Sequence, residues 1–413
     1  MKSYLEKRAF TGPIIQNPPD LELRLFVVIP CFNETSLLPV FQSLQACTLP
    51  QTGKVEILAV INASEMAPGH IIGQNQRCEA EVKEWISTHA QGNKSVQFHV
   101  CIFNALPAKH AGVGLARKIG MDEGLRRFKQ IGTNGIIVNL DVDCTVSENY
   151  FLAIDAHFRE NPVDGAGIHF EHPIENESEE IRHAIVQYEL HLRYYINMQR
   201  LIGFPWAYQT IGSAMAVRSH IYEAQGGMNK RKAGEDFYFL QKIIELGRFS
   251  EMNNATVYAS ARKSDRVPFG TGKAVNDITQ ADGEYSLYNP KSFEILQVLF
   301  ERIEDYYQAQ EGDIEKLNLQ LDDSLRAYLN IWGFNSKIIE INQFTSNAEA
   351  FKKRFFREFN AFQLMKYLHW MRDEHYPNVS VGEGITYLFG KLGLNKSENP
   401  DDDLITLRRY DRD

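Results

Sequence analysis

Short apolar runs alternate with amphipathic stretches through the first part of the chain. Runs typical of buried strands cover residues 25–30, 55–61, 96–103, 136–140 and 163–170. Between them, apolar residues recur at helical spacing over residues 36–47, 72–89 and 112–129. Strands that alternate with helices of these lengths predict a mostly parallel sheet with right-handed crossovers, which is an α/β fold.

The pattern changes toward the end of the chain. A long amphipathic helix is predicted over residues 179–201, another over 234–246 and a short strand over 255–259. From about residue 292 only helical spacing remains, at 292–307, 314–329 and 348–370, and the acidic stretch 397–403 is expected to be mobile. We therefore predict an N-terminal arm at 1–22, an α/β domain at 23–290 and a helical region at 291–413.

Composition narrows the class of protein. With 413 residues, 44% of them hydrophobic, the chain can bury a large core as one domain with an appendage or as two domains. A formal charge of −9 disfavours sequence-independent binding to nucleic acid or to an anionic membrane. The five cysteines lack C-x-x-C spacing, which disfavours a zinc site or a disulfide framework, and we expect a cytoplasmic protein without a transmembrane segment.

Two carboxylates one residue apart carry the first chemical signal. Asp141 and Asp143 directly follow the apolar run at 136–140. In an open α/β sheet, ligands bind outside the carboxyl ends of the strands, so these acids are expected at the mouth of a metal and phosphate site. The alternative is that they only cap a helix beginning near Ser147.

Further charged pairs follow along the chain. Glu235 and Asp236 open a predicted helix, where they either act chemically or simply interact with the helix dipole. Arg262 and Arg266 lie four apart in a Gly/Pro-rich loop, which suits phosphate binding or an ordinary surface loop. Arg117 lies at a glycine-containing helix start that is an anion-binding candidate but does not match a dinucleotide fingerprint.

Aromatic residues offer one candidate for sugar stacking. Trp206 lies in the loop at 203–208, between Pro205 and Ala207, and is either a stacking platform or a buried anchor. The tyrosines at 188, 194 and 195 recur at helical spacing, which is more typical of packing.

Taken in order, four segments resemble the family 2 glycosyltransferases of the GT-A fold, over roughly residues 23–271. They are the run at 27–34 that ends in Cys31-Phe32-Asn33-Glu34, the D-x-D at 141–143, the stretch 211–218 leading to Gly226-Gly227, and Gly234-Glu235-Asp236. The resemblance implies a Rossmann-like, mostly parallel mixed sheet flanked by helices, with the helical region as a C-terminal appendage.

The resemblance also implies a reaction. A hexosyltransferase-like enzyme would transfer a sugar from a nucleotide-diphosphate sugar to a carbohydrate, lipid-linked or small-molecule acceptor, with inversion. Mn²⁺ or Mg²⁺ would bridge the diphosphate to the D-x-D, with Asp143 as the direct ligand and Asp141 also touching ribose or sugar. Asp236 would be the general base, with Glu235 next in line. The remaining predicted donor-site residues are Pro30, Glu34, Asn62, Arg117, Arg262 and Arg266, and the predicted substrate-site residues are Trp206, Gly212 and Ser213.

Two departures from the family pattern modify this expectation. Asn62 stands where many relatives have aspartate, so recognition of the nucleotide base would either differ or rely on Glu34 and Glu65. No histidine follows soon after the Glu-Asp helix to serve as a third metal ligand, so cation affinity would depend on the bound diphosphate.

Two other classes of protein remain open at this point. A nucleotidyltransferase usually has a Gly-rich basic loop after the first strand, where this chain has Cys31-Phe32-Asn33-Glu34. The intact acidic pairs disfavour a non-catalytic carbohydrate-binding module.

Overall fold

The structure is a computed structural model that describes residues 3–90, 95–264, 270–280 and 284–413. The chain divides into two compact units. The sheet unit comprises Met1–Ser178, Thr210–Asn276 and Tyr410–Asp413, and the helical unit comprises Glu179–Gln209 and Asp277–Arg409. The helix predicted at 179–201, which we placed in the α/β domain at 23–290, thus belongs to the helical unit. The domain boundaries stay a prediction.

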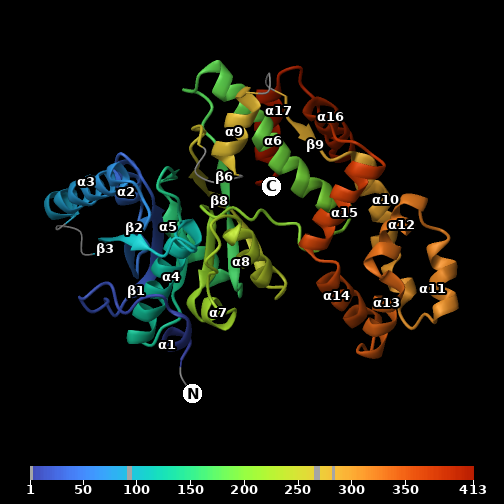
Figure 1. Ribbon diagram of the computed structural model, residues 1–413, viewed down its shortest axis with the longest axis horizontal. Coiled ribbons are helices and arrows are strands. Elements are labelled where there is room, and N and C mark those ends of the chain that lie inside the picture. Colours follow the sequence, from blue (N-terminus) through green and yellow to red (C-terminus); the bar gives the residue numbers. More distant parts are fainter. Residues whose placement is uncertain (1–2, 91–94, 265–269, 281–283) are drawn as a thin grey trace. The chain divides into compact units, whose positions relative to one another are not determined.

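Within the described residues, the sheet unit contains a mixed sheet of eight strands in the order β3-β2-β1-β4-β7-β6-β8-β5 (Figure 1). Strands β1 to β4 are parallel, whereas β7 runs antiparallel to both β4 and β6. The predicted fold class, a mostly parallel mixed sheet flanked by helices with a helical C-terminal region, is confirmed. The strands are β1 (Leu23–Cys31), β2 (Lys54–Ser64), β3 (Val96–Leu106), β4 (Ile136–Asn139), β5 (Thr145–Val146), β6 (Gly165–Glu171), β7 (Met215–Arg218) and β8 (Phe249–Tyr258).

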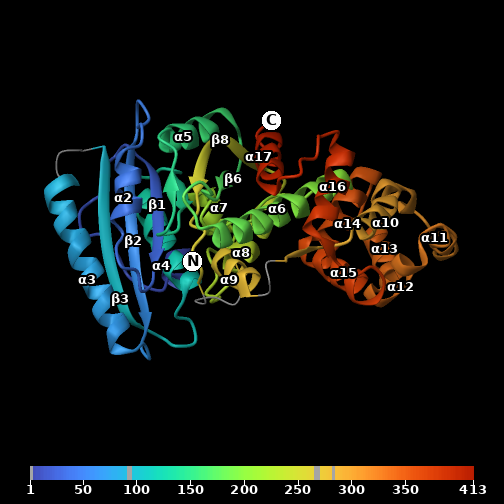
Figure 2. The same ribbon diagram turned by 90° about the horizontal axis from the view of Figure 1, so that it is seen from above.

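Helices cover both faces of the parallel strands (Figure 2). Phe98 of β3 packs against Phe41 of α2 (Leu38–Gln45) and Trp85 of α3 (Gly69–Trp85), with ring centroids 5.0 and 5.2 Å apart. Side chains alternate along a strand, so Glu56 of β2 points to the opposite face from Ile57, which is paired with Phe98. There Glu56 forms a buried ion pair with Arg127 of α4 (Val113–Gln130). Helices therefore cover both faces of the part of the sheet formed by β1 to β4.

Pro30 lies inside β1, although the sequence predicted that it ends the strand. The Val28 carbonyl accepts a hydrogen bond from the Leu140 N–H at 3.1 Å, so Val28 faces β4. Pro30, two residues further, faces the same side, where β4 has already ended at Asn139. The N–H that proline lacks therefore costs no bond of the sheet, and β1 continues to Cys31.

The N-terminal arm lies along α4. Tyr4, in the short helix α1 (Tyr4–Arg8), donates its hydroxyl to Asp122 at 2.9 Å and accepts from Lys118 at 2.7 Å. Further along the arm, the backbone N–H groups of Ile14 and Ile15 donate to the buried Glu123 carboxylate. The arm thus provides hydrogen-bond partners for charged side chains that are buried on α4. These bonds help to fix α4, the helix that carries Arg117.

We expect Tyr4→Phe to lower the free energy of unfolding by about 1.5–3 kcal/mol, the typical range for a hydrogen bond to a charged group. Asp122 keeps the Tyr222 hydroxyl at 2.7 Å and Lys118 at 3.0 Å, so the fold should survive. Urea unfolding measures the loss, with Tyr410→Phe at an exposed tyrosine as the control. Equal unfolding midpoints for both variants would show that the Tyr4 hydroxyl contributes nothing.

The remaining helices of the sheet unit differ from the predicted ranges mainly at their ends. The strand predicted at 255–259 begins earlier, as β8 starts at Phe249. Helix α9 crosses the division between the two units after Asn276. The helices are α5 (Tyr150–Glu160), α7 (Ser219–Ala224), α8 (Glu235–Ile244) and α9 (Thr271–Gln280), and α3 is extended by the π-helical turn η1 (Ile86–Ala90).

The helical unit packs around aromatic side chains such as Phe300, Phe355 and Phe359. The helix predicted at 348–370 is two helices, separated at Phe359 and Asn360, because the Asn360 side chain caps the second. A two-residue ladder between β9 (Ser286–Leu287) and β10 (Val379–Ser380) was not predicted. The helices are α6 (Glu179–Leu201), α10 (Pro290–Glu301), the 3-10 turn η2 (Ile303–Tyr306), α11 (Glu311–Asn318), α12 (Asp323–Trp332), α13 (Phe334–Gln343), α14 (Ala348–Glu358), α15 (Ala361–Glu374), α16 (Val381–Leu392) and α17 (Pro400–Tyr410).

The acidic stretch at 397–403, which we predicted to be mobile, leads into α17 and contributes its first turn. Its aspartates at 401–403 form the first turn of α17, where the helix dipole favours negative charge. Asp403 is buried and accepts from the Ser397 N–H and from Lys396. Among the described residues, every helix is too short or too polar to cross a membrane.

Candidate functional site

Acidic side chains gather at the carboxyl ends of β1 and β4, neighbouring parallel strands. Glu34 follows β1, and Asp141 and Asp143 follow β4. The two aspartates do not cap α5, because β5 intervenes and Asn149 is the N-cap residue of that helix. The alternative that they only cap a helix is therefore wrong, and the edge of the sheet explains their position.

Arg262 joins two of these acids across a long sequence separation. Its guanidinium donates to both oxygens of Glu34, at 2.7 and 2.5 Å, and lies 2.9 Å from Asp143 Oδ2. Glu34 is buried, whereas the side chain of Arg262 keeps 38% of its surface exposed. The carboxylates raise the pKa of Arg262 further above its ordinary value, so the arginine stays charged.

Arg117 makes the corresponding link between the other two acidic segments. It donates to Asp141 at 2.6 Å and to Glu235, and only 4% of its side-chain surface is exposed. The Asp141, Glu235 and Asp236 carboxylates outweigh the effect of burial and raise the pKa of Arg117. Predicted as a phosphate ligand, Arg117 is instead enclosed by carboxylates and holds the D-x-D segment beside the start of α8.

Two glycines permit this close packing. A Cβ on Gly212 would lie 2.5 Å from the Arg117 guanidinium nitrogens, and one on Gly114 would lie 2.2 Å from the Arg231 carbonyl oxygen. The N-terminus of α4, which was an anion-binding candidate, thus packs against the segment that precedes α8. Ser213, the neighbour of Gly212, is buried, and its side chain contacts the Cys144 thiol.

Glu235 and Asp236 lie in the first turn of α8 but differ in exposure. Glu235 is buried against Arg117, and burial raises its pKa to about 6 despite that cation. Asp236 is partly exposed, accepts from the Phe237 N–H at 2.7 Å and also lies near the Gly212 backbone. Burial and the Asp141 carboxylate raise the pKa of Asp236, while Arg117 opposes the rise. Of the pair, Asp236 is the better placed to reach a substrate.

Asn62 holds the ends of the strands together. It is 2% exposed, and its amide donates to the Cys31 carbonyl at 2.8 Å. Its own backbone carbonyl accepts from Asn75, whose side-chain oxygen accepts the Asn33 N–H at 3.1 Å. Asn33 has φ 51°, so this network fixes an unusual backbone turn immediately before Glu34. The contact predicted between Asn62 and the nucleotide stays a prediction, and the observed role is to support the Glu34 loop.

Asn75 was missed from the sequence, although a signal for it exists. It lies on α3 in the buried stripe formed with Cys78, Val82 and Trp85. A polar residue in such a stripe usually has a buried hydrogen-bonding partner, so its position could have marked it.

Trp206 and Arg266 are the remaining predicted site residues. Trp206 is buried in the helical unit, where its indole N–H donates to the Phe356 carbonyl at 2.9 Å. This favours the buried anchor over the sugar platform. Arg266 lies outside the described residues.

The D-x-D offers oxygen donors of the kind that divalent cations prefer. Asp141 and Asp143 offer oxygen donors on partly exposed side chains, and burial together with the Asp141 charge raises the pKa of Asp143. A divalent cation relieves such repulsion between carboxylates. No group of three or more His, Cys, Asp or Glu side chains forms a metal site within the described ranges. The donor set therefore fits Mg²⁺ or Mn²⁺ held by few carboxylates together with substrate phosphates.

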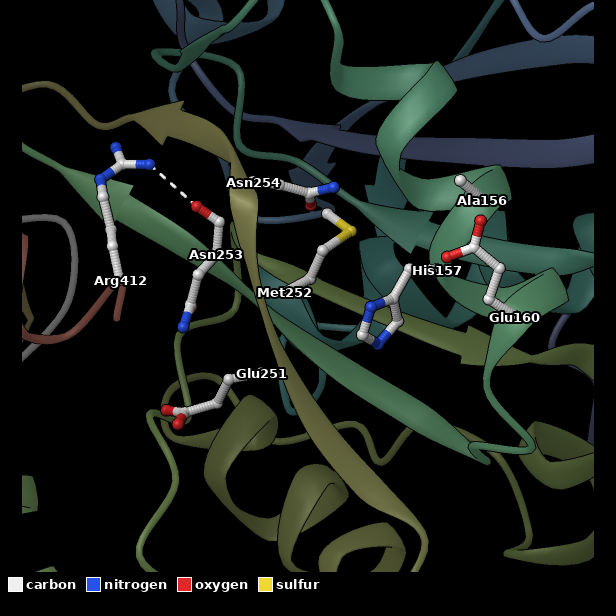
Figure 3. Close-up of a pocket in the computed structure, with 8 residues that line it drawn as sticks. All are labelled: Ala156, His157, Glu160, Glu251, Met252, Asn253, Asn254 and Arg412. Carbon is white, nitrogen blue, oxygen red and sulfur yellow. Dashed lines mark hydrogen bonds between the residues drawn. The ribbon is translucent and has the colours of Figure 1, made fainter.

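A separate polar cavity of about 290 Å³ lies elsewhere in the sheet unit (Figure 3). His157 of α5, Glu251 and Asn253 of β8, and Arg412 near the chain end line it. Arg412 donates to the Asn253 carbonyl at 2.9 Å and to Glu171 at 2.8 Å. None of the predicted site residues lines this cavity, so the acidic cluster is the candidate site.

Comparisons with known proteins give distant structural matches. No protein-family model and no curated protein matches the chain. Two similar solved structures are S. aureus TarS 1-349 in complex with UDP and in complex with UDP-GlcNAc. The first has a TM-score of 0.42 and 13% identity and covers 82% of this chain and 92% of that chain. The second has a TM-score of 0.42 and 12% identity, over 81% and 92%.

Proposed function

We propose that this chain is a family 2-like glycosyltransferase that transfers a sugar from a nucleotide-diphosphate sugar to an acceptor hydroxyl, with inversion. One observation supports this most. Acids from three distant segments, at Glu34, at Asp141 and Asp143, and at Glu235 and Asp236, are linked through Arg117 and Arg262. Independent helix caps would have no reason to converge in this way.

On the donor side, Asp143 and Asp141 would hold Mn²⁺ or Mg²⁺, which when bound neutralises charge on the leaving diphosphate. Arg262 is partly exposed at the same place and presents a planar fork that matches phosphate oxygens. Glu34, fixed by the Asn62 and Asn75 network, lies beside Arg262 and is the candidate for contacting the nucleoside.

On the acceptor side, Asp236 accepts the proton from the attacking hydroxyl. Burial raises its pKa, which makes it a stronger base than an ordinary aspartate. Glu235 stays bound to Arg117 and positions the first turn of α8. A single base on the acceptor side is consistent with direct displacement and therefore with inversion.

The test is a thermal-shift screen of nucleoside diphosphates and nucleotide sugars with Mn²⁺, followed by an assay for hydrolysis of whichever sugar nucleotide stabilises the protein. We expect stabilisation that disappears in Asp143→Ala, and slow release of nucleoside diphosphate. Release of pyrophosphate from a nucleoside triphosphate and a sugar phosphate would instead identify a nucleotidyltransferase. Stabilisation without any turnover of donor, with or without acceptors, would identify a binding module.

A further inference from the structure

We propose that Arg262 is an exchangeable partner for the acids of the site: it competes with a divalent cation for Asp143, and the donor diphosphate draws it away. Cation and donor binding would then be coupled through one side chain. This inference rests on the proposed function and assigns to Arg262 a role in the order of binding, beyond that of a phosphate ligand.

The first step is geometric. The Arg262 guanidinium contacts three carboxylate oxygens, two of Glu34 at 2.7 and 2.5 Å and Oδ2 of Asp143 at 2.9 Å. A cation bound to that Asp143 oxygen at about 2.0–2.2 Å would lie within a few ångströms of the guanidinium carbon. Two cations at that distance repel each other strongly in a partly desolvated site. Simultaneous contact of both with the same carboxylate oxygen is therefore unfavourable.

The second step concerns which of the two arginines can move. Arg117 is held by Asp141 and Glu235 with 4% of its side-chain surface exposed, and Gly212 lies against its guanidinium. Arg262 has 38% of its side chain exposed and lies in a stretch outside any helix or strand. Only Arg262 has room to rotate without opening the interior, so Arg117 keeps the acids together while Arg262 exchanges partners.

The third step supplies the alternative partner. Arg262 holds Glu34 through a bidentate pair, and two oxygens of a tetrahedral phosphate group can accept the same guanidinium fork. A diphosphate bound near Asp143 therefore replaces the contact that Arg262 loses there and supplies oxygen ligands to the cation. A cation that binds without the diphosphate has to break the contact between Arg262 and Asp143, and no new partner for Arg262 replaces it. We infer that Mn²⁺ binds weakly by itself and tightly with the diphosphate.

The experiment measures Mn²⁺ binding by electron paramagnetic resonance of the free ion, without and with a nucleoside diphosphate identified by the screen above. The full chain is compared with Arg262→Gln and with Arg262→Lys, which keeps the charge but loses the fork. Arg248→Gln is the matched control, because it removes the same charge from an arginine that pairs with Asp164 at 2.8 Å and is 60% exposed. Asp143→Ala reports whether Mn²⁺ is bound at the proposed site.

We expect Arg262→Gln to bind Mn²⁺ alone about tenfold more tightly than the full natural chain, as removal of one like charge at short range predicts. The increase in its Mn²⁺ affinity on addition of diphosphate should be correspondingly smaller. Arg248→Gln should bind Mn²⁺ as the unsubstituted chain does, without and with diphosphate. Unchanged Mn²⁺ affinity in Arg262→Gln, with binding still abolished by Asp143→Ala, overturns the exchange and leaves the proposed function intact. Loss of Mn²⁺ binding in every condition, with diphosphate present, overturns the metal assignment of the proposed function as well.

Discussion

Asp236→Asn is expected to lower kcat for sugar transfer by about 10²–10⁴-fold, the range that general base catalysis contributes. Asparagine preserves the shape of the side chain and can keep an oxygen acceptor for the Phe237 N–H. It cannot remove a proton from the acceptor hydroxyl. Donor binding, measured by calorimetry with Mn²⁺ present, should remain unchanged because the donor-binding acids and Arg262 are untouched.

The pH profile distinguishes a base from a structural aspartate. Burial raises the pKa of Asp236 above its ordinary value of 3.8, and the base must be ionised to act. Activity should therefore rise with pH through this raised pKa, so that kcat/KM is lost on acidification earlier than for an unperturbed aspartate. In Asp236→Asn the residual activity should lack this rise.

The control for this variant is Asp323→Asn, which changes an aspartate in the first turn of α12 in the helical unit. Full activity is expected there. Near-normal turnover of Asp236→Asn with donor binding intact would refute the base assignment, and Glu235 would be tested next by Glu235→Gln.

Arg117→Leu is expected to lower the free energy of unfolding by about 3–5 kcal/mol, as removal of one partner from a buried ion pair does. The change leaves Glu235 buried without its cation and removes the link to Asp141. Leucine cannot restore these contacts, although it fills part of the space. We expect loss of donor binding as well, because Asp141 and α8 are no longer held beside each other.

Arg159→Leu provides the comparison, since Arg159 pairs with Asp155 but keeps 49% of its side chain exposed. That change should cost less than about 1 kcal/mol, because Arg159 is half exposed and the buried Asp155 carboxylate keeps its ion pair with Arg24 at 2.7 Å. Urea unfolding monitored by circular dichroism measures both variants. Equal stability of Arg117→Leu and Arg159→Leu would contradict the central position that we give to Arg117.

Much of the fold follows from local pattern. The apolar runs at 55–61 and 136–140 lie within or around β2 and β4, and the predicted helix at 179–201 matches α6. Hydrophobic periodicity records which face of a segment is buried, and that information is local in the sequence. Ends of elements were less predictable. The cap at Asn360 and the ordered turn at Asp403 depend on contacts with residues that periodicity does not specify.

The residue types of the site could likewise be read from the sequence, because carboxylates directly after buried strands suit a ligand site at the sheet edge, although helix capping was an open alternative. Their partners could not be predicted. Arg262 meets Glu34 across 228 residues, and Arg117 meets Glu235 across 118. Trp206 had two open interpretations until its contact with Phe356 favoured burial.

The sequence by itself determined most of the longer strands and helices, although not β5, β7, β9 and β10, together with the acids at the strand ends and the helix start at Glu235. Only the tertiary structure decided which charges neutralise one another, which arginine is enclosed and which keeps an exposed side chain. The physical reason is that burial and pairing depend on the distance between atoms in space. A sequence motif fixes the chemistry of a side chain, while the folded chain fixes its surroundings, its pKa and its freedom to move.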